Sequence, residues 1–476
     1  MNINTWRFVR DVIEGSDSVK KHAKTYVPQG KIEDEDYADR IKRAEFFPAT
    51  SRTAEGVHGL AFSKEPQITN LDDNLREYLQ NVDGKGNDIY KFINDCTWED
   101  MITNHGGCLL DAPNGEGLSQ AAAELVGIRP YIISYRAEQI LEIRTKTVGR
   151  AEVISMVRLK EYEVVPKEGD EYTTELKERY RVLKLDENGD YVHSYYDEKE
   201  NEIFTTIPKK FGKPLKYIPF YIKDIIPLKP IFKDLADVNI AHFQVSVDHR
   251  NALHWIGAPT PFISGYQPET KTRQLADGTI EEYAVDTLKL GANKVNYLPM
   301  GATANYLELG GSGLQHLVNA MEADEEKMAI LGARIISQEK KGVESAETAR
   351  IHRAGENSVI ATFCNEESKM FTRLFKDYLE WTVGRENTVD ENFAIKINTD
   401  YETSKMSPSE IGELISAWQQ GAISRKILFA NLKEGEVIDN ATSYEQMIDD
   451  IQEEKETMTS VQNMNQTDNG DDNEKV

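Results

Sequence analysis

The stretch from Ser312 to Gly384 constrains the fold of this chain more than any other. Its pattern predicts two consecutive helices, Ser312 to about Arg334 and about Ala346 to Val383, joined by a short polar connector. In the second helix the large apolar residues recur at spacings of three and four, so they line one face. These residues are Ile360, Phe363, Phe371, Leu374, Phe375, Tyr378 and Leu379.

The beginning of this second helix, Glu344 to Ser358, has a different character. It carries alanines and charged residues where bulky apolar residues would be expected. Small residues let a neighbouring backbone come close, while arginines need water or an acidic partner. The pattern indicates a helix that leaves a core and enters a second environment. The alternative is one long domain helix with a frayed start.

The charge of the chain limits its partners. Its 476 residues carry a net charge of −25, with an isoelectric point of about 4.9. Proteins that grip duplex nucleic acid usually neutralise its phosphates with Lys and Arg, so the chain as a whole is not such a binder. A local basic patch is still compatible with this charge. An anionic membrane surface is disfavoured for the same reason.

Cysteines and apolar runs indicate the compartment. Cys96, Cys108 and Cys364 are far apart and odd in number, which excludes a disulfide framework and favours a reducing compartment. No apolar run approaches the roughly 18 residues that span a bilayer. The N-terminus lacks the apolar core and cleavage site of a signal peptide. We therefore expect a soluble protein in cytoplasm-like conditions.

The order of periodicities predicts an α+β fold. The first hundred residues are expected to be mainly helical, and the region from Arg129 to about Tyr221 to form a mostly antiparallel sheet packed on those helices. The expected helices are Asp36 to Phe47, Thr53 to about Phe62, one around Leu71 to Leu79, and one that begins near Ile89. The expected strands are Cys108 to Leu110, Tyr131 to Tyr135, Val153 to Leu159, Arg179 to Leu185, Tyr191 to Tyr195 and Tyr217 to Ile222.

Helix is expected again from Phe232 to Trp255, and prolines and glycine end it at Gly257 to Pro261. Its expected stripe is Leu235, Val238, Ala241, His242 and Val245. A small β-rich insertion follows from Phe262 to Leu309. Its expected strands are Thr279 to Val285 and Val295 to Leu298.

The C-terminal part predicts a strand at Phe393 to Ile397 and then two short helices. Ser407 before Pro408 is a good helix start, and Ser424 is a candidate cap for the second helix. Beyond about Gln452 almost no large apolar residue remains, so we expect a disordered tail.

No motif indicates catalysis. The chain contains no GxxxxGK[ST], GxGxxG, GxSxG or HExxH sequence. His242, His249 and His254 lie near one helix, but steps of seven and five do not place three imidazoles around one metal. Cys364 is better explained as a buried apolar thiol. We expect no catalytic residue, no metal and no cofactor.

One basic cluster remains, at Lys340, Lys341, Arg350, His352 and Arg353. It could contact a polyanion. The residues alone favour the alternative, in which these cations pair locally with neighbouring acidic residues. Those neighbours are Glu339, Glu344, Glu347 and Glu356.

The order of elements and several stretches together resemble the portal proteins of tailed phages. The stretches are DYADRIKRAEFFPATSRTAEGVHGLAFSKEP, RPYIISYRAEQI, ADVNIAHFQVSVDHRNALHWIGAPTPFISG, ESAETARIHRAGENS and SPSEIGELISAWQQGAISRKILFANL. The resemblance covers roughly Asp36 to Leu432. Each stretch is a pattern of size and polarity rather than of chemistry, and the resemblance rests on their joint order.

The resemblance implies the following division of the chain: a wing of helices and sheet at 1–230, a first stem helix at 231–257, a β-rich clip at 258–311, a second stem helix at 312–336, a tunnel loop at 337–345, a long helix returning to the wing at 346–403, a short helical crown at 404–440 and an acidic tail at 441–476. By the same resemblance Gln338, Lys340 and Lys341 would face a DNA channel, with Arg350 and Arg353 nearby.

The resemblance also implies a function without catalysis. The family forms a ring, usually of twelve subunits, at one capsid vertex of the virion, and double-stranded DNA is packaged and ejected through it. The implied partners are the terminase ATPase, the capsid or scaffolding protein and a head-tail adaptor, with assembly in the host bacterial cytoplasm and no membrane. Two alternatives stay open: a metal-dependent hydrolase or nuclease of phage origin, and a cytoplasmic scaffold or adaptor that binds no DNA.

Overall fold

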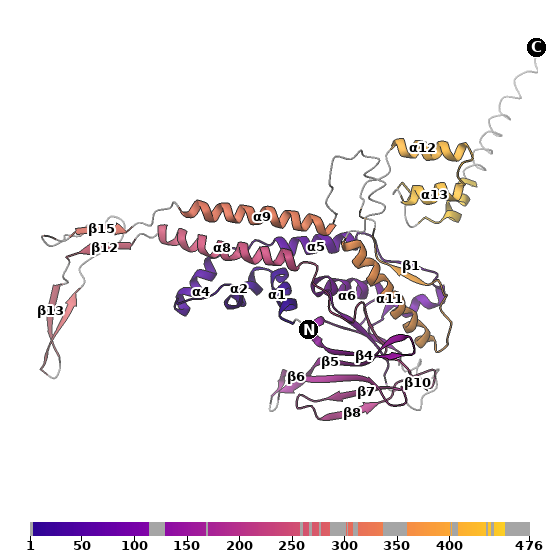
Figure 1. Ribbon diagram of the computed structural model, residues 1–476, viewed down its shortest axis with the longest axis horizontal. Coiled ribbons are helices and arrows are strands. Elements are labelled where there is room, and N and C mark those ends of the chain that lie inside the picture. Colours follow the sequence, from indigo (N-terminus) through magenta and orange to yellow (C-terminus); the bar gives the residue numbers. More distant parts are fainter. Residues whose placement is uncertain are drawn as a thin grey trace, which may run out of the picture. The chain divides into compact units, whose positions relative to one another are not determined.

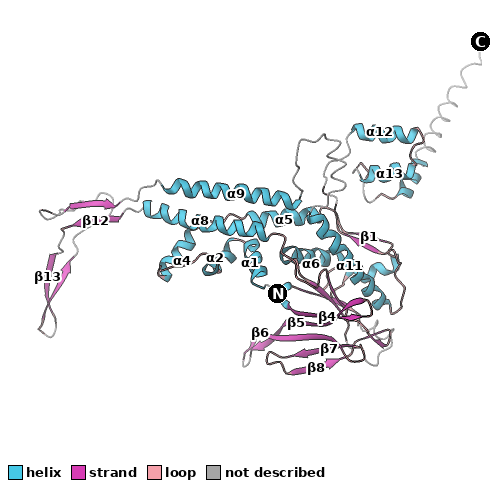
Figure 2. Ribbon diagram, in the orientation of Figure 1, coloured by secondary structure: helices cyan, strands magenta, loops and turns pink. Residues whose placement is uncertain are grey.

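The chain folds into an α+β structure, as predicted (Figure 1 and Figure 2). The computed structural model describes residues 3–113, 129–167, 170–257, 260–265, 269–275, 278–285, 301, 303–307, 313–336, 359–399, 401, 408–434, 437–438 and 442–452. It divides into two compact units, Met1–Thr399 and Asp400–Val476. The division into wing, stem, clip, tunnel loop, crown and tail is a finer statement that stays a prediction.

The N-terminal region is helical, as expected, but several boundaries differ. Its elements are α1 (Ile3–Glu14), α2 (Ser16–Lys21), α3 (Ala23–Tyr26), α4 (Asp34–Arg43), α5 (Ala49–Ala61), the 3-10 helix η1 (Asp73–Gln80) and α6 (Ile89–Thr103). We did not predict α1, although Trp6, Val9 and Val12 on it are buried. Where we expected a helix around Leu71 to Leu79, the structure has the 3-10 helix η1.

The predicted helix from Asp36 to Phe47 is wrong at its C-terminal end. It ends at Arg43, because Ala44 is extended and the chain turns so that Phe46 packs edge-to-face on Phe243 at 5.8 Å between ring centroids. The next helix begins directly after Pro48, four residues earlier than predicted. Tertiary packing and Pro48 therefore outweigh the helical pattern here.

Two antiparallel sheets replace the single sheet that we predicted. The three-stranded sheet has the order β11-β2-β3, formed by Phe220–Ile222, Gly107–Asp111 and Tyr131–Tyr135. The other is a five-stranded meander of β4 (Ile140–Val148), β5 (Ala151–Lys167), β6 (Asp170–Leu185), β7 (Tyr191–Tyr196) and β8 (Glu202–Thr206). The strands β4 and β8 were not predicted. A short hairpin of β9 (Lys209–Lys210) and β10 (Lys213–Pro214) follows.

Two long helices, α8 (Lys233–Gly257) and α9 (Leu314–Ile336), lie side by side and antiparallel (Figure 1). Between them in sequence stand β12 (Thr260–Ser264), β13 (Glu269–Gln274), β14 (Ile280–Val285) and β15 (Thr303–Leu307). β12 pairs with β15 and β13 with β14, both antiparallel. The strand predicted up to Val285 is thus confirmed, while Val295 to Leu298 lies outside the described residues.

Helix α11 (Val359–Val383) covers the C-terminal part of the long helix that we predicted, and residues 346–358 lie outside the described part. All seven apolar residues of its predicted face are buried. The strand β16 (Ala394–Lys396) pairs antiparallel with β1 (Gln67–Thr69). The apolar period of α11 therefore identified a core helix correctly.

The second unit contains α12 (Pro408–Gln419) and α13 (Arg425–Glu434). The predicted cap of α13 is confirmed, because Ser424 Oγ accepts a hydrogen bond from the backbone N–H of Ile427 at 3.3 Å. The predicted cap Ser407 and the acidic tail beyond Gln452 lie outside the described residues.

Candidate functional site

The predicted DNA-channel residues all fall in one segment whose placement is not described. Gln338, Lys340, Lys341, Arg350 and Arg353 lie within residues 337–358. Their role in DNA contact therefore stays a prediction.

The two helices that flank this segment are firmly held. Helices α9 and α11 contact each other, and each has a buried apolar residue next to the segment, Ile335 on α9 and Ile360 on α11. Helix α9 also packs closely on α5, where a Cβ at Gly332 would lie 3.3 Å from Thr53 Oγ1. Both attachment points of segment 337–358 are consequently anchored in the packed body of the first unit.

The buried face of α8 differs from the predicted stripe. Ala241 is exposed and Val238 and Val245 are half-buried, whereas two polar residues, Asn239 and Ser246, are buried. Leu235 and His242 of the predicted stripe are buried, but the prediction overlooked Asn239 and Ser246 because they interrupt the apolar spacing. A polar residue belongs on a packed face when its hydrogen bonds are satisfied there.

The N-terminal segment supplies the hydrogen bonds that these two residues need. Asn239 Oδ1 accepts from Thr50 Oγ1 at 2.8 Å, and Asn239 Nδ2 donates to the carbonyl of Phe47 at 2.8 Å. Ser246 Oγ accepts from the backbone N–H of Glu45 at 3.2 Å. These hydrogen bonds attach α8 to the chain that connects α4 to α5.

Of the three histidines on α8, His242 is buried, His249 is half-buried and His254 is exposed. His242, which we placed correctly on the inner side of α8, is buried, and its Nε2 lies 3.3 Å from Glu325 Oε1 on α9. Among the described residues no three His, Cys, Asp or Glu side chains are arranged to hold a metal ion. The absence of a metal site in the whole chain stays a prediction.

A buried ionic cluster joins α6, α11 and the chain after β11. Lys223 Nζ lies 3.0 Å from Glu367 Oε1 and donates to Asn104 Oδ1 at 2.8 Å, and it stands 3.9 Å from the centre of the Phe363 ring. Glu367 is fully buried. Because an unpaired charge is costly in such surroundings, Lys223 and Glu367 depend on each other.

Asp100 belongs to the same buried region. Burial, together with the nearby charge of Glu367, raises its pKa well above the ordinary value, although Lys223 acts in the opposite direction. Its surroundings therefore favour the neutral carboxyl form over the charged one. The chain leaves no room beside it, since a Cβ at Gly106 would lie 1.9 Å from Asp100 Oδ1.

A second buried cluster connects the two sheets. Arg181 on β6 donates from Nη1 to Asp111 Oδ2 on β2 at 2.8 Å, and its Nε lies 2.8 Å from Glu161 Oε1 on β5. Tyr131 donates to Asp111 Oδ2 at 3.3 Å. Burial lowers the pKa of the adjacent His193 to about 4 despite the nearby Asp111 carboxylate, so this imidazole is neutral at pH 7.

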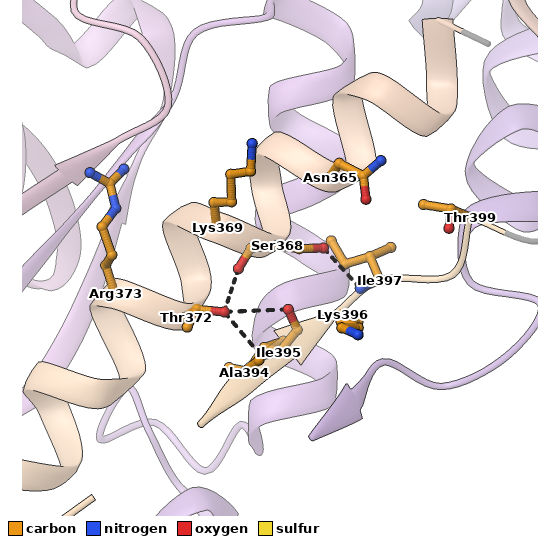
Figure 3. A pocket seen from close by; sticks show the side chains of 10 residues that line it. All are labelled: Asn365, Ser368, Lys369, Thr372, Arg373, Ala394, Ile395, Lys396, Ile397 and Thr399. Carbon is orange, nitrogen blue, oxygen red and sulfur yellow. Dashed lines mark hydrogen bonds between the residues drawn. The ribbon is translucent and has the colours of Figure 1, made fainter. Parts of the chain in front are cut away.

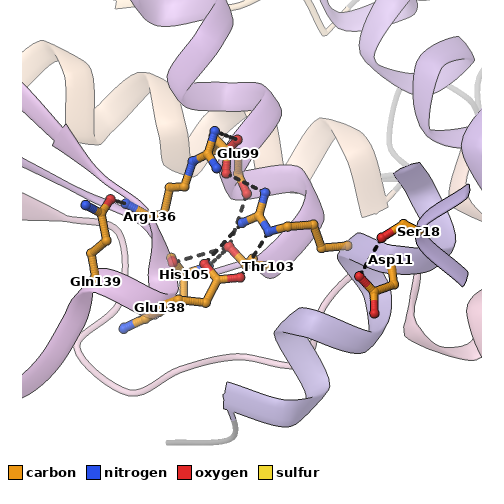
Figure 4. A network of polar contacts seen from close by, with 9 residues as sticks. Asp11, Ser18, Glu99, Thr103, His105, Arg136, Glu138 and Gln139 are labelled. Carbon is orange, nitrogen blue, oxygen red and sulfur yellow. Dashed lines mark hydrogen bonds and ion pairs between the residues drawn. The ribbon is translucent and has the colours of Figure 1, made fainter. Parts of the chain in front are cut away.

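A third network holds α1 to the body of the first unit (Figure 4). Arg10 donates to both carboxylate oxygens of Glu138, at 3.0 and 3.1 Å, and to Glu99 Oε2 at 2.9 Å. Trp6 stacks on His105 with 5.3 Å between ring centroids. Burial lowers the pKa of His105 to about 4, with Lys223 acting in the same direction.

The cysteines do not form a reactive site. Cys364 is buried, as predicted. The sulfurs of Cys96 and Cys108 lie 4.0 Å apart at a cavity of about 310 Å³, and the Cys108 thiol together with burial raises the pKa of Cys96. A thiol that resists ionisation is a poor nucleophile.

An open pocket of about 870 Å³ lies between α11 and β16 (Figure 3). Its lining residues are Asn365, Ser368, Lys369, Thr372, Arg373, Ala394, Ile395, Lys396, Ile397 and Thr399. Inside it, two hydroxyls of α11 bind the backbone of the β16 strand and the residue after it. Ser368 Oγ accepts from the N–H of Ile397 at 3.0 Å, and Thr372 Oγ1 accepts from the N–H of Ile395 at 3.0 Å.

Sequence reasoning missed the buried clusters and this pocket. Lys223 and Glu367 are 144 positions apart, and Arg181 and Asp111 are 70 apart. No local spacing relates such pairs, and in a chain with 81 acidic residues a single carboxylate carries no signal. The one available signal was the like charge of Lys369 and Arg373 at helical spacing.

Comparisons with known proteins give three results. Residues 231–382 match a family described as a domain of unknown function, DUF4055. The matched part runs from just before α8 to the end of α11. A search of curated protein sequences gives no match.

Among solved structures, the chain is similar to three gene transfer agent (GTA) particle structures. For "Virion of native gene transfer agent (GTA) particle" the identity is 11% and the TM-score 0.36, over 83% of this chain and 92% of that chain. For "Neck of empty GTA particle computed with C6 symmetry" the identity is 10% and the TM-score 0.35, over 83% of this chain and 92% of that chain. For "Neck of native GTA particle computed with C12 symmetry" the identity is 12% and the TM-score 0.34, over 81% of this chain and 89% of that chain.

Helices able to cross a bilayer are also absent from the described residues: none there combines the required length with the required apolar character.

Proposed function

We propose that this chain is a portal protein of a tailed phage or phage-like particle, which forms a ring-shaped channel at one capsid vertex. The observation that carries the proposal is the antiparallel pair α8 and α9. At one end the two helices are joined through the β-rich insertion, and at the other end α9 leads through segment 337–358 into the core helix α11.

The arrangement of these elements suits a channel subunit. The helix pair is fixed to the body through α5 and through the hydrogen bonds of Asn239, so repeated copies can present the same pair around an axis. The insertion forms its own small sheets, separate in their hydrogen bonding from the sheets of the body. It exposes Ile280 and Tyr283 on β14, which offer apolar contact to a docking protein.

The charge of the chain also fits a conduit. Each phosphate that a Lys or Arg neutralises adds affinity for DNA, and a channel must pass DNA without holding it. With a net charge of −25, a ring of such subunits repels the DNA backbone and keeps it centred. A few basic residues, in this proposal Lys340 and Lys341, then give weak and transient contacts.

The proposal assigns no catalysis to this chain. The energy for packaging comes from a separate terminase ATPase, and further partners are the capsid or scaffolding protein and a head-tail adaptor. The ring, usually of twelve subunits in this family, assembles in the host bacterial cytoplasm and remains in the virion.

Negative-stain electron microscopy of the purified full-length chain tests the proposal. Closed rings with a central hole, and no cleavage of duplex DNA with or without Mg²⁺, are the expected result. A stable monomer with metal-dependent hydrolysis would instead assign the chain to the hydrolases. A monomer without activity would favour a scaffold or adaptor.

A further inference from the structure

The pocket between α11 and β16 carries three cations that the fold itself does not use. Lys369 and Arg373 extend from α11 and Lys396 from β16 (Figure 3). All three are exposed, and none forms an ion pair with another residue in the described part of the chain. By contrast, two other lysines that contact α11, Lys210 and Lys223, are paired with its carboxylates.

The positions of these cations are unfavourable for the isolated subunit. Lys369 and Arg373 are four residues apart on one helix, where like charges repel. Lys396 adds a third positive charge at the same pocket. A negatively charged ligand would relieve this repulsion.

The shape of the pocket indicates which kind of ligand fits. Its hydroxyls, Ser368 and Thr372, are already bound to the backbone of Ile395 and Ile397, so the cations supply most of its free hydrogen-bond donors. The pocket is concave, and a DNA duplex is a stiff cylinder that would touch only its rim. A protruding protein segment with several carboxylates enters such a pocket more readily.

The chain itself presents such a segment at the start of α4. Glu33, Asp34, Glu35 and Asp36 are consecutive, and all four are exposed. Lys24 pairs with Asp34 at 2.9 Å, while Glu33, Glu35 and Asp36 form no ion pair with any described residue. Helix α4 packs on α8, whereas the pocket is built from α11 and β16.

We propose that the α11–β16 pocket of one copy receives the acidic start of α4, residues 33–36, from the next copy in the ring. The inference rests on the proposed ring. A ring needs a heterologous interface, in which one surface of each subunit contacts a different surface of its neighbour. A cationic pocket and an acidic helix start on different elements satisfy this requirement. Single exposed ion pairs contribute little, but several pairs repeated at each interface also set orientation and speed association.

A charge-swap experiment on the full-length chain tests the contact. The pocket variant is K369E/R373E/K396E, and the helix variant is E33K/E35K/D36K, which leaves the Asp34–Lys24 pair intact. Each variant alone is expected to lose the closed rings seen for the wild type by negative-stain microscopy and analytical ultracentrifugation. An equal mixture is expected to regain them, because alternating copies pair opposite charges at every interface of an even-numbered ring.

Controls separate this contact from folding and from net charge. The far-UV circular dichroism spectrum of the pocket variant should match that of the wild type, since all three side chains are exposed and their replacement leaves the subunit folded. The variant K146E/R150E/K167E changes the net charge equally on exposed β-strand and turn positions and should still form rings. For the helix variant, E33Q/E35Q/D36Q removes the charges without reversing them and should also reduce ring closure.

The outcomes distinguish the contact from the ring itself. A wild type that stays monomeric overturns both the portal proposal and this contact. Rings formed by the pocket variant alone, or no recovery in the mixture, overturn the contact and leave the ring. A pocket variant that keeps its rings but binds a 30-base-pair duplex more weakly assigns the pocket to nucleic acid.

Discussion

Arg181 Nη1 on β6 lies 2.8 Å from Asp111 Oδ2 on β2, and the two residues belong to different sheets. Their side chains are almost fully buried, with 4% and 7% exposed. The hydrogen bond therefore connects the five-stranded meander to the three-stranded sheet from inside the core. Tyr131 and Glu161 complete the surroundings of the pair, so each charge has polar partners.

Replacement of Arg181 by Met should destabilise the fold severely. The change leaves Asp111 and Glu161 without the buried cation between them, and loss of one partner of a buried pair costs about 3–5 kcal/mol. Urea unfolding should show a lower midpoint with an unchanged slope. The control Arg144→Met breaks an exposed pair with Glu142 and should change stability by less than about 0.5 kcal/mol. Equal losses in both variants would contradict this interpretation.

Replacement of Lys223 by Met should also cost about 3–5 kcal/mol, because the fully buried Glu367 loses its cation. The double variant K223M/E367Q should be more stable than K223M, since the second change removes the unpaired charge. Unfolding in urea at pH 7 measures both. Lys91→Met, at an exposed pair with Asp95, is the matched control and should be near neutral. A double variant less stable than K223M would disprove the coupling.

Stability should fall as pH is lowered from about 6.5 to about 4. His105 and His193 have folded pKa values of about 4, below the ordinary value of 6.5, so the unfolded chain binds more protons within this window. Each contributes on the order of 3 kcal/mol at most, present in full above pH 6.5 and lost as pH falls. Urea unfolding of His193→Phe should therefore give a flatter pH dependence than the wild type.

The contribution of Asp100 to the stability of the fold changes with pH in the opposite direction to that of the two histidines. Its folded pKa is raised, so its contribution is present below the ordinary carboxyl pKa and is lost as pH rises. Asp100→Asn should accordingly make the rise in stability between pH 4 and 6.5 steeper. A flatter curve for this variant would mean that Asp100 is ionised in the folded protein.

Gly106→Ala should destabilise the chain, because the added Cβ would lie 1.9 Å from Asp100 Oδ1 and 2.9 Å from its Cγ. Asp100 is enclosed and cannot move without disturbing the Lys223 cluster, so we expect a loss of about 1–3 kcal/mol. Gly56→Ala on α5 meets no atom within 4 Å and should stabilise the helix by about 0.5–1 kcal/mol. Thermal unfolding of the two variants should show shifts of opposite sign.

Lys340→Ala/Lys341→Ala should assemble rings but package or retain less DNA than the wild type, if these lysines contact DNA in the channel. The measurement is nuclease-protected DNA per particle in complemented phage or phage-like particles. Lys146→Ala/Lys167→Ala, at exposed positions of β4 and β5, is the control. Wild-type packaging and retention by the Lys340/Lys341 variant would remove the contact role.

The predictable parts of the fold were those with a strong local period. The buried face of α11 followed from apolar spacing, and the Ser424 cap from its position before a helix. Helix α1 was not predicted, although Trp6, Val9 and Val12 on it carry the same kind of signal.

The parts that could not be predicted depend on partners distant in sequence. Asn239 on the inner face of α8 breaks the apolar pattern, and only its hydrogen bonds to Thr50 and Phe47 explain it. The division into two sheets arises from strand pairing, which alternation alone does not specify. The channel residues Gln338, Lys340, Lys341, Arg350 and Arg353 were derived from a family resemblance, and they stay predictions.

The two hydroxyls that α11 places against the β16 strand have a consequence for the crowded conditions of assembly. An uncovered strand edge is a template on which another chain can add a strand and begin an aggregate. Ser368 and Thr372 occupy the outward N–H groups of Ile397 and Ile395, and Thr372 also donates to the Ile395 carbonyl at 3.3 Å. The β16 edge of the short β1–β16 ribbon is thereby protected from strand addition. Many copies can then accumulate in one cell without joining through this edge.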